Sequence, residues 1–384
     1  MEPIPFNRPY LVGTETGYIE DAVRGGWLAS GGEFGKRCER EIAERTGSVR
    51  ALVTNSATAG LEAAALVAGL GPGDEVIMPS YTFVTTASSV ALRGATPVFA
   101  DIEPETLNLS PAAVEAAITP RTKAIVPVHY AGVACEMDAL LELAEGRDLA
   151  VIEDAAQGLM STYKGRPLGA LGDLGAISFH ETKNVTCGEG GALLVGDEEL
   201  RERAEVVWGK GTNRARFDRG EIDKYSWVDL GSSFGLGEVS AAFLWGQLER
   251  VEEITARRMA IWDRYHAAFA ELEDAGALRR PIVPGDRTHN AHMYYVLLPD
   301  RASRDRLLAD LSARDILAVF HYVPLHSSPA GARTGRAAGP LPITDDVAGR
   351  IARLPLWTGM EAGTTDRVIE AVTDSVGAAA GGRR

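Results

Sequence analysis

Short apolar runs alternate with helical patterns along the first two thirds of this 384-residue chain. The runs typical of buried strands span residues 76–78, 96–100, 124–128, 150–152 and 176–179, and the helical patterns include 59–68, 111–117 and 137–145. Strands that are connected through helices run parallel, and their sheet is covered on both faces. The alternation therefore predicts an α/β fold built on a mostly parallel sheet.

A long helical stretch at residues 240–272 follows this alternating region. The remaining sequence predicts a strand at 292–298, a helix at 303–314 and a second strand at 317–322. A chain of this length is long enough for more than one domain. We therefore expect a large domain over residues 1–245 and a smaller C-terminal α/β domain over residues 246–384.

The composition argues against several classes of partner. A net charge of −14 disfavours nucleic acid, because phosphate backbones select basic surfaces. No run approaches the roughly 18 apolar residues of a membrane span, and the first residues lack the pattern of a secretory signal. The cysteines, Cys38, Cys135 and Cys187, are too few and too scattered for a zinc cluster or a disulfide framework. We expect a cytoplasmic protein that binds neither nucleic acid nor membrane and holds no metal.

Asp154 and Lys183 each follow a predicted strand. Asp154 lies in the sequence EDAAQ directly after the run 150–152, and Lys183 lies in SFHETKN, just before a Gly-rich stretch. In parallel sheets the ligand site forms at the carboxyl ends of the strands. An acid that keeps a pyridine nitrogen protonated and a lysine that binds an aldehyde covalently are what a pyridoxal phosphate (PLP) enzyme requires. The two residues therefore predict a PLP enzyme in which both are catalytic.

Two other segments fit the same cofactor. Residues 54–60 are small and hydroxylic and precede a helix, where backbone amides and neighbouring hydroxyls form a site suited to a phosphate. Phe83 follows the run 76–78 and could stack on a pyridine ring. Each feature alone has an ordinary explanation, such as a helix N-cap, a core aromatic, a paired carboxylate or a surface lysine. Their joint order along the chain is much more specific.

A basic cluster stands out in this acidic chain. Between residues 208 and 220 the sequence carries Lys210, Arg214, Arg216 and Arg219 against the single acid Asp218. A solvated loop would explain such a cluster. The alternative is a site for a diphosphate, which arginine suits through paired hydrogen bonds.

The sequence resembles the sugar-nucleotide aminotransferases of the DegT/DnrJ/EryC1/StrS family over nearly its whole length. The segments that carry this resemblance are GWLASG (26–31), GPGDEVI (71–77), PSYTF (79–83), GATPVF (94–99), EDAAQ (153–157) and SFHETKN (178–184). Within the family it is most similar to enzymes that aminate C4 of dTDP-4-keto-6-deoxyglucose, through VHYAGVACEMD (128–138), KGTNR (210–214) and HYVPLH (321–326).

The resemblance implies PLP-dependent transferase fold type I, with a seven-stranded sheet in the large domain and a smaller C-terminal domain. It implies that Lys183 binds the cofactor and moves the substrate proton, and that Asp154 pairs with the pyridinium nitrogen. The other implied contacts are Gln157 with the phenolic oxygen, Phe83 with the ring face, and Ala57, Thr58 and Ser178 with the phosphate. Ser233 stands where many members have an asparagine that reaches the phosphate of a neighbouring subunit. Candidates for packing against the sugar are Trp27, His321, Tyr322 and His326.

The implied reaction transfers an amino group from L-glutamate to C4 of a dTDP-sugar, in a homodimer with shared active sites. The same residues are equally compatible with amination at C3 or with the other C4 epimer. Family members with histidine at the lysine position are dehydratases, whereas this chain has Lys183. A PLP-binding or nucleotide-sugar-binding protein without turnover is disfavoured because Lys183, Asp154 and Gln157 are intact. A dinucleotide-dependent oxidoreductase is disfavoured because no Gly-x-Gly-x-x-Gly follows the first strand.

Overall fold

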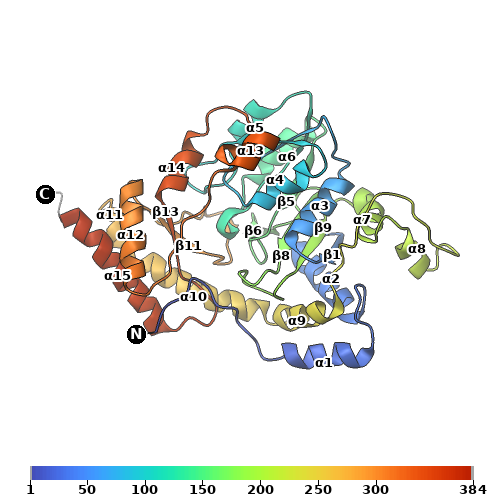
Figure 1. The fold of residues 1–384 in the computed structure, drawn as a ribbon, viewed down its shortest axis with the longest axis horizontal. Coiled ribbons are helices and arrows are strands. Elements are labelled where there is room, and N and C mark those ends of the chain that lie inside the picture. The colour runs from blue at the N-terminus through green and yellow to red at the C-terminus, as the bar shows by residue number, and fades with distance from the viewer. Residues whose placement is uncertain (1, 382–384) are drawn as a thin grey trace.

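The computed structural model describes residues 2–381 of the chain (Figure 1). The helices are α1 (Glu15–Gly25), α2 (Glu33–Thr46), α3 (Ala57–Val67), α4 (Val84–Ala91), α5 (Pro111–Ala117), α6 (Met137–Glu145), α7 (Arg201–Trp208), α8 (Arg214–Asp218), α9 (Glu238–Leu248), α10 (Val251–Ala268), α11 (Ala270–Asp274), α12 (Arg301–Ala313), α13 (Pro329–Thr334), α14 (Pro342–Arg350) and α15 (Ala362–Gly381). Short 3₁₀ helices are η1 (Tyr130–Gly132), η2 (Glu198–Leu200) and η3 (Leu325–Ser327). The strands are β1 (Arg50–Thr54), β2 (Glu75–Pro79), β3 (Thr96–Ala100), β4 (Thr122–Ile125), β5 (Ala150–Asp154), β6 (Thr162–Tyr163), β7 (Arg166–Pro167), β8 (Leu174–Ser178), β9 (Gly191–Val195), β10 (Arg287–Thr288), β11 (Tyr294–Leu297), β12 (Arg336–Ala337) and β13 (Ile351–Leu354).

The central sheet has eight strands in the order β1-β9-β8-β5-β4-β2-β3-β12. The pairs β1–β9 and β9–β8 are antiparallel, and all the others are parallel. The predicted mostly parallel sheet is therefore confirmed, but the expected number of seven strands is wrong. The extra strand β12 contributes only two residues to the edge beside β3, so no apolar run in the sequence marks it.

All five strands predicted from apolar runs are present, as β2, β3, β4, β5 and β8. Helices cover both faces of the sheet, because successive strand residues point to opposite sides. In β1, Leu52 packs into the cluster that includes α3 and α7, whereas Ala51 and Val53 pack into the cluster that includes α2 and α9. Helices α5 and α6 cover the rest of this second face through Val114 and Leu140.

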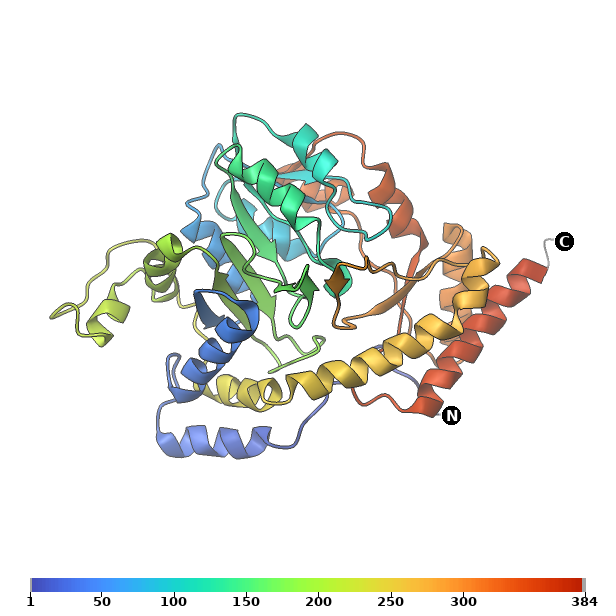
Figure 2. The same ribbon diagram turned by 180° about the vertical axis from the view of Figure 1, so that it is seen from behind.

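The predicted helical stretch is confirmed as the consecutive helices α9, α10 and α11, which run along one side of the molecule (Figure 2). Helix α9 packs against α1 and α2, and α10 packs against α15. The predicted strand at 292–298 and helix at 303–314 are confirmed as β11 and α12. Strand β11 pairs antiparallel with β13, and both belong to a separate apolar core with Tyr265 and Trp357.

The predicted strand at 317–322 is wrong. The backbone N–H of Leu317 donates to the carbonyl of Ile4, and Val319 forms an isolated bridge with Arg353. The carbonyl of His321 accepts a hydrogen bond from the hydroxyl of Tyr81. The side chains from Leu317 to Val323, apart from Ala318, line a cavity instead. The apolar pattern here reflects a cavity wall and not a strand of a sheet.

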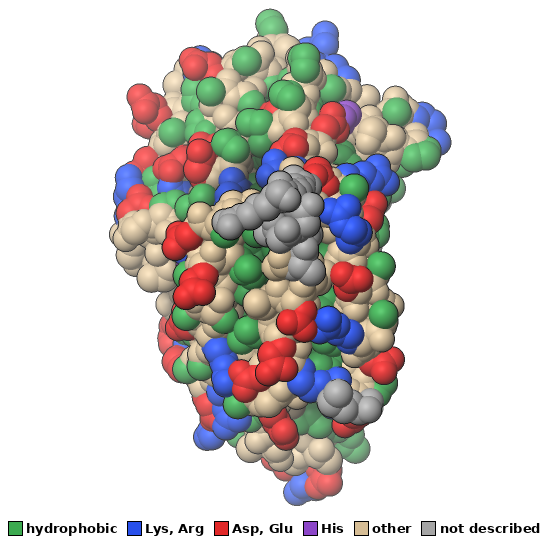
Figure 3. All heavy atoms as spheres, turned by 90° about the vertical axis from the view of Figure 1, so that its left-hand side faces the viewer, with side chains coloured by type: hydrophobic (Ala, Val, Ile, Leu, Met, Phe, Trp, Pro, Cys, Tyr) green, Lys and Arg blue, Asp and Glu red, His purple; other side chains and the backbone are tan. Residues whose placement is uncertain are grey.

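The described face of the molecule that the C-terminal helices form carries charges of both signs. On the described part of this face, Lys and Arg are interspersed with Asp and Glu (Figure 3). Among residues 2–381, no helix combines the length and the hydrophobicity that crossing a bilayer requires.

Candidate active site

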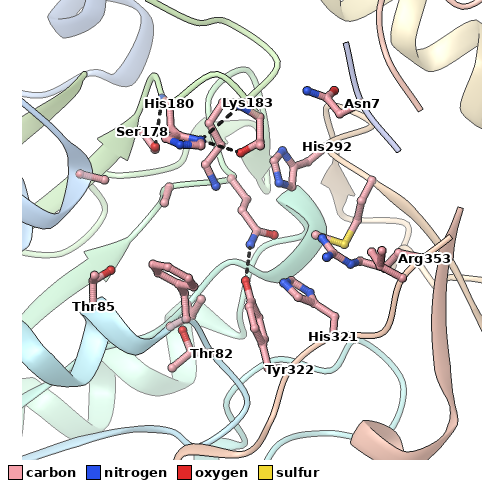
Figure 4. Close-up of a pocket in the computed structure, with 18 of the residues that line it drawn as sticks. Asn7, Thr82, Thr85, Ser178, His180, Lys183, His292, His321, Tyr322 and Arg353 are labelled. Carbon is pink, nitrogen blue, oxygen red and sulfur yellow. Dashed lines mark hydrogen bonds between the residues drawn. The ribbon is translucent and has the colours of Figure 1, made fainter. Parts of the chain in front are cut away.

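A cavity of about 740 Å³ opens at the carboxyl ends of β5 and β8. Its wall combines the starts of α3 and α4 with segments from the N-terminal and C-terminal parts of the chain. Figure 4 shows Ser178 and Thr85 on one side, Arg353 and His321 on the opposite side, and Lys183 between them. The two sides come from parts of the sequence more than 100 residues apart, so the site exists only in the folded chain.

Lys183 follows β8 on a tight loop, and its backbone N–H donates to the carbonyl of His180. Burial and the nearby guanidinium of Arg353 lower the pKa of Lys183 to about 8, although the carboxylate of Asp154 opposes the shift. A low dielectric and a like charge both disfavour the ammonium form. The structure thus supplies both conditions that give a lysine a useful neutral fraction near pH 7.

Asp154 is the last residue of β5 and is buried. Its Oδ2 accepts a hydrogen bond of 2.7 Å from the hydroxyl of Thr86, and its Oδ1 accepts one of 3.2 Å from the backbone N–H of Ala156. Thr82 in turn contacts the Thr86 hydroxyl at 2.8 Å. These neutral donors orient the carboxylate without neutralising it, so its charge remains available to a group in the cavity.

A second buried network supports Asp154 from behind. The carboxylate of Glu153 contacts Nε2 of His129 at 2.8 Å and accepts backbone N–H groups from Gly169 and Gly172, both at 2.8 Å. Burial alone would raise the pKa of Glu153, but His129 and these N–H groups hold it below its usual range. The backbone N–H of His129 donates to the carbonyl of Asp154. The network therefore fixes the strand end from which Asp154 projects.

The start of α3 forms an anion cradle beside Ser178. Ser56 caps the helix by accepting the N–H of Ala59 at 3.1 Å, and Ala57 and Thr58 line the cavity. Gly191 of β9 lies so close that a Cβ there would be 2.4 Å from the nitrogen of Ala57. Because glycine has no Cβ, β9 can lie against the first residue of α3 without a steric clash. The free N–H groups and the positive end of the helix dipole suit a phosphate.

Phe83 and Gln157 face the space between this cradle and Tyr322. Phe83 remains 54% exposed although it follows a buried strand, and its ring centroid lies 6.4 Å from that of Tyr322. Gln157 accepts the N–H of Ala131 at 2.7 Å through Oε1, which turns Nε2 toward the hydroxyl of Tyr322 at 3.3 Å. The cavity thus offers an aromatic face and an amide donor beside the acid and the lysine.

Most of the residues that the sequence predicts for the site line this one cavity. They are Ala57, Thr58, Phe83, Asp154, Gln157, Ser178, Lys183, His321 and Tyr322. Together they fit PLP: a cradle for the phosphate, an acid for the ring nitrogen, an aromatic for the ring face and a lysine for the aldehyde. Their individual roles toward the cofactor stay predictions.

The other predicted site residues do not line the cavity. The carbonyl of Ser233 accepts a hydrogen bond from Asn55, and His326 contacts Ser80 at 2.8 Å and Asp345 at 3.5 Å. Lys210, Arg214, Arg216 and Arg219 lie on or beside α8, which projects from the body of the molecule (Figure 1). The three arginines there form ion pairs with acids. Their predicted role toward a diphosphate stays a prediction.

Two cavity arginines are absent from the sequence-based prediction. Arg258 is buried and donates to the carbonyls of Ala291 and His292, and burial lowers the pKa of this guanidinium to about 9. Arg353 lies over the ring of Phe6 and, among the described residues, has no acid partner, while its Nε is buried without an acceptor. Neither residue lies in a motif next to the catalytic segments, and no local signal identifies them.

The lowered pKa of Lys183 predicts how its reactivity depends on pH. A lysine with an ordinary pKa of 10.5 is neutral in about one molecule in three thousand at pH 7, whereas a pKa of about 8 gives about one in ten. We expect cofactor-free protein to be acylated at Lys183 with a rate that rises with pH and levels off above about pH 8. Peptide mass mapping after brief labelling would measure it, with the exposed Lys164 as the internal reference. If the acylation rates of Lys183 and Lys164 rose with pH at the same midpoint, the prediction would be contradicted.

Comparisons with known proteins identify the family of this chain. The model of the DegT/DnrJ/EryC1/StrS aminotransferase family matches residues 9–373. The spore coat polysaccharide biosynthesis protein SpsC of Bacillus subtilis (strain 168) is 36% identical over 381 residues, covering 97% of both proteins. DesV from S. venezuelae, solved in complex with a ketimine intermediate, has a TM-score of 0.88 and 34% identity, with 98% of this chain and 99% of that one covered.

A third similar structure bears on the cofactor. Spr1654 from Streptococcus pneumoniae, solved in its PLP form, has a TM-score of 0.89 and 28% identity, with 98% of this chain and 99% of that one covered. The same protein has also been solved in its PMP form. With a family match over nearly its full length, and a lysine, an acid and a phosphate cradle in one cavity, this chain belongs to the DegT/DnrJ/EryC1/StrS aminotransferase family and is a PLP-dependent sugar aminotransferase of fold type I.

Proposed function

We propose that this aminotransferase moves an amino group from L-glutamate to C4 of dTDP-4-keto-6-deoxy-D-glucose, giving a dTDP-4-amino-4,6-dideoxyhexose. The observation that carries the proposal is that two segments similar to C4-aminating enzymes, 128–138 and 321–326, meet at the cavity. The hydroxyl of Tyr130 lies 3.0 Å from Nδ1 of His321, and the ring of Tyr130 contacts that of Tyr322. Val128, His321 and Tyr322 line the cavity itself.

The residues of the chain divide the work between binding and proton transfer. Bound PLP supplies an electron sink for the carbon that loses its proton. Asp154 keeps the pyridine nitrogen positive, and the neutral amine of Lys183 takes the proton from the reacting carbon and returns it. The rings of Phe83 and Tyr322 line the cavity and limit the access of water to the reacting atoms.

Arg353 provides the counter-charge for an acidic amino donor. Its guanidinium reaches into the cavity from β13 and, among residues 2–381, makes no ion pair. An unpaired cation in a partly buried cavity costs folding free energy. A bound ligand with a negative charge offsets this cost. The carboxylate of glutamate is such a ligand, because arginine binds carboxylates through paired hydrogen bonds. Phe6, over which Arg353 lies, holds the guanidinium in place.

Replacing Arg353 with glutamine tests this role. Because a hydrogen bond to a charged group contributes about 1.5–3 kcal/mol, we expect the KM for L-glutamate to rise by roughly 10- to 100-fold. The KM for the keto sugar should change much less. Steady-state kinetics with each substrate varied would measure both, and Arg257→Gln is the matched control because Arg257 pairs with Glu253 outside the cavity. An unchanged KM for glutamate would exclude Arg353 as its counter-ion.

A homodimer is part of the proposal. The segment around α8 projects from the body in both ribbon views (Figures 1 and 2). It exposes five large apolar or aromatic side chains, Phe217, Tyr225, Trp227, Val228 and Leu230, and Trp227 is 76% exposed. Such a concentration of apolar surface is typical of a protein interface. In such a dimer, the basic residues Lys210 to Arg219 of one subunit would lie near the cavity of the other subunit. Sedimentation of the active enzyme as a monomer would refute this arrangement.

The purified protein with PLP, L-glutamate and then dTDP-4-keto-6-deoxyglucose tests the reaction. We expect glutamate to bleach the visible absorption of the bound cofactor, and the keto sugar to restore it. NMR of the product would identify the aminated carbon and its configuration. An amine at C3 would favour the alternative reaction at the neighbouring carbon. A cofactor band that never responds to glutamate would favour a protein that binds PLP or nucleotide sugars without turnover.

A further inference from the structure

His292 is held rigidly in the wall of the cavity, on the same side as Arg353 (Figure 4). Its backbone N–H donates to Oδ1 of Asn290 at 3.0 Å, and its carbonyl accepts a hydrogen bond from Arg258 at 2.8 Å. Asn290 is itself buried, and its amide donates to the carbonyls of Gln157 and Leu159 at 2.8 and 2.7 Å. The position of His292 is thus tied to the loop that carries Gln157.

Asn184 determines which ring nitrogen of His292 carries a proton. The amide Nδ2 of Asn184 donates to the carbonyl of Asn290 at 2.8 Å, and that carbonyl can only accept. The opposite end of the amide, Oδ1, therefore faces Nδ1 of His292 at 3.2 Å. Because an amide oxygen also only accepts, the proton must be on Nδ1 of the imidazole.

The second nitrogen, Nε2, is left with a free lone pair. Burial, together with the charges of Lys183, Arg258 and Arg353, holds the pKa of His292 well below its usual range, so the ring is neutral near pH 7. A neutral imidazole with its proton on Nδ1 has an acceptor at Nε2. Within residues 2–381, no group donates a hydrogen bond to this atom, and the ring lines the cavity. The imidazole thus presents a fixed acceptor among cationic side chains.

We propose that Nε2 of His292 accepts a hydrogen bond from a hydroxyl of the sugar, on a carbon next to the reacting ketone, and that Asn184 is the positioning residue that makes this nitrogen an acceptor. The inference rests on the proposed function. A ketone and a carboxylate are acceptors only, so they do not match a lone pair, and the amino group is the reacting nitrogen beside Lys183. Among the groups close to the reacting carbon, a hydroxyl of the hexose is the donor that remains, and its recognition would make His292 a specificity-determining residue.

Kinetics with a matched pair of keto sugars test the hydroxyl. Wild-type enzyme should prefer the substrate over the analogue that lacks this hydroxyl by roughly 10- to 100-fold in kcat/KM, because the analogue leaves a buried acceptor unpaired. His292→Phe keeps a ring but no lone pair, and should reduce this preference to nearly one. His266→Phe, which replaces a ring stacked on Trp262 outside the cavity, should keep the wild-type preference. An unchanged preference in His292→Phe would overturn the inference.

Nitrogen NMR of the imidazole tests the tautomer independently of turnover. Wild-type protein should show His292 neutral and protonated at Nδ1, and Asn184→Ala should shift the signals toward a mixture of both tautomers. A protonated Nε2 in the wild type would overturn the inference even if the enzyme is active. Failure of the wild type to aminate any keto sugar would instead overturn the proposed function, and the hydroxyl with it, whatever the NMR result.

Discussion

Replacing Lys183 with arginine should lower the rate of amino transfer by about 10³- to 10⁴-fold or more. General acid–base catalysis by a positioned side chain contributes about 10²- to 10⁴-fold, and this variant also loses the covalent bond to the cofactor. Arginine keeps the positive charge and much of the length, so the loss would reflect the missing neutral amine. A guanidinium stays protonated, whereas the cavity lowers the pKa of Lys183 to about 8.

The measurement is the single-turnover rate of the cofactor-loaded variant with L-glutamate, followed by absorbance. Lys164→Arg is the matched control, because Lys164 is exposed and pairs with Asp138 outside the cavity. Thermal unfolding of both variants would show whether the fold is intact. A small primary amine added to Lys183→Ala should restore part of the rate, since it can enter the space left by the side chain. More than a tenth of the wild-type rate in Lys183→Arg would show that another group moves the proton.

The parts of the site that the sequence predicts are those carried by short continuous segments. Asp154 and Lys183 each lie within a few residues of the end of a buried strand, and parallel strands bring such ends together in any sheet of this class. The phosphate cradle is equally local, because a cap at Ser56 and the helix start at Ala57 are adjacent in sequence. Each of these residues therefore lies in the structure at the end of the strand or helix that its own stretch of sequence predicts.

The residues that the sequence does not predict depend on contacts between distant segments. Arg353 faces the cavity because β13 pairs with β11 and because Val319 bridges to it. Arg258 lies in the middle of α10 and reaches the cavity wall only through the carbonyls of Ala291 and His292. A single arginine in a helix or a short strand looks the same in sequence whether it faces solvent or a ligand.

Two errors in the predicted fold have the same origin. The segment 317–322 has the apolar content of a strand, yet its neighbours are the cavity and Tyr81, and a strand requires a partner along its whole length. Strand β12 has a partner but only two residues, and neither is apolar enough to be noticed. Strand pairing depends on two segments, so an apolar run in one segment does not show whether that segment has a partner.

Replacing Asp154 with asparagine should lower kcat by about 10²- to 10³-fold while KM for L-glutamate changes little. Removing one preorganised electrostatic group from an active site typically costs this much, and the acid acts on the cofactor and not on the carboxylate of the donor. The side chain is nearly isosteric, and the donors that orient it, the Thr86 hydroxyl and the Ala156 N–H, remain. The change therefore removes the charge with little change in shape.

A cofactor analogue separates the electrostatic role of Asp154 from a structural one. PLP methylated at the ring nitrogen is permanently positive, so it does not need the acid, and it should restore much of the lost rate in Asp154→Ala. In wild-type enzyme the same analogue should be no better than PLP, because Asp154 already keeps the nitrogen charged. Asp138→Asn, at an exposed carboxylate that pairs with Lys164 and Arg166, is the control for loss of an acid elsewhere. If the methylated cofactor gives no recovery although it binds, Asp154 acts mainly by holding the strand end, and the pairing with the ring nitrogen must be abandoned.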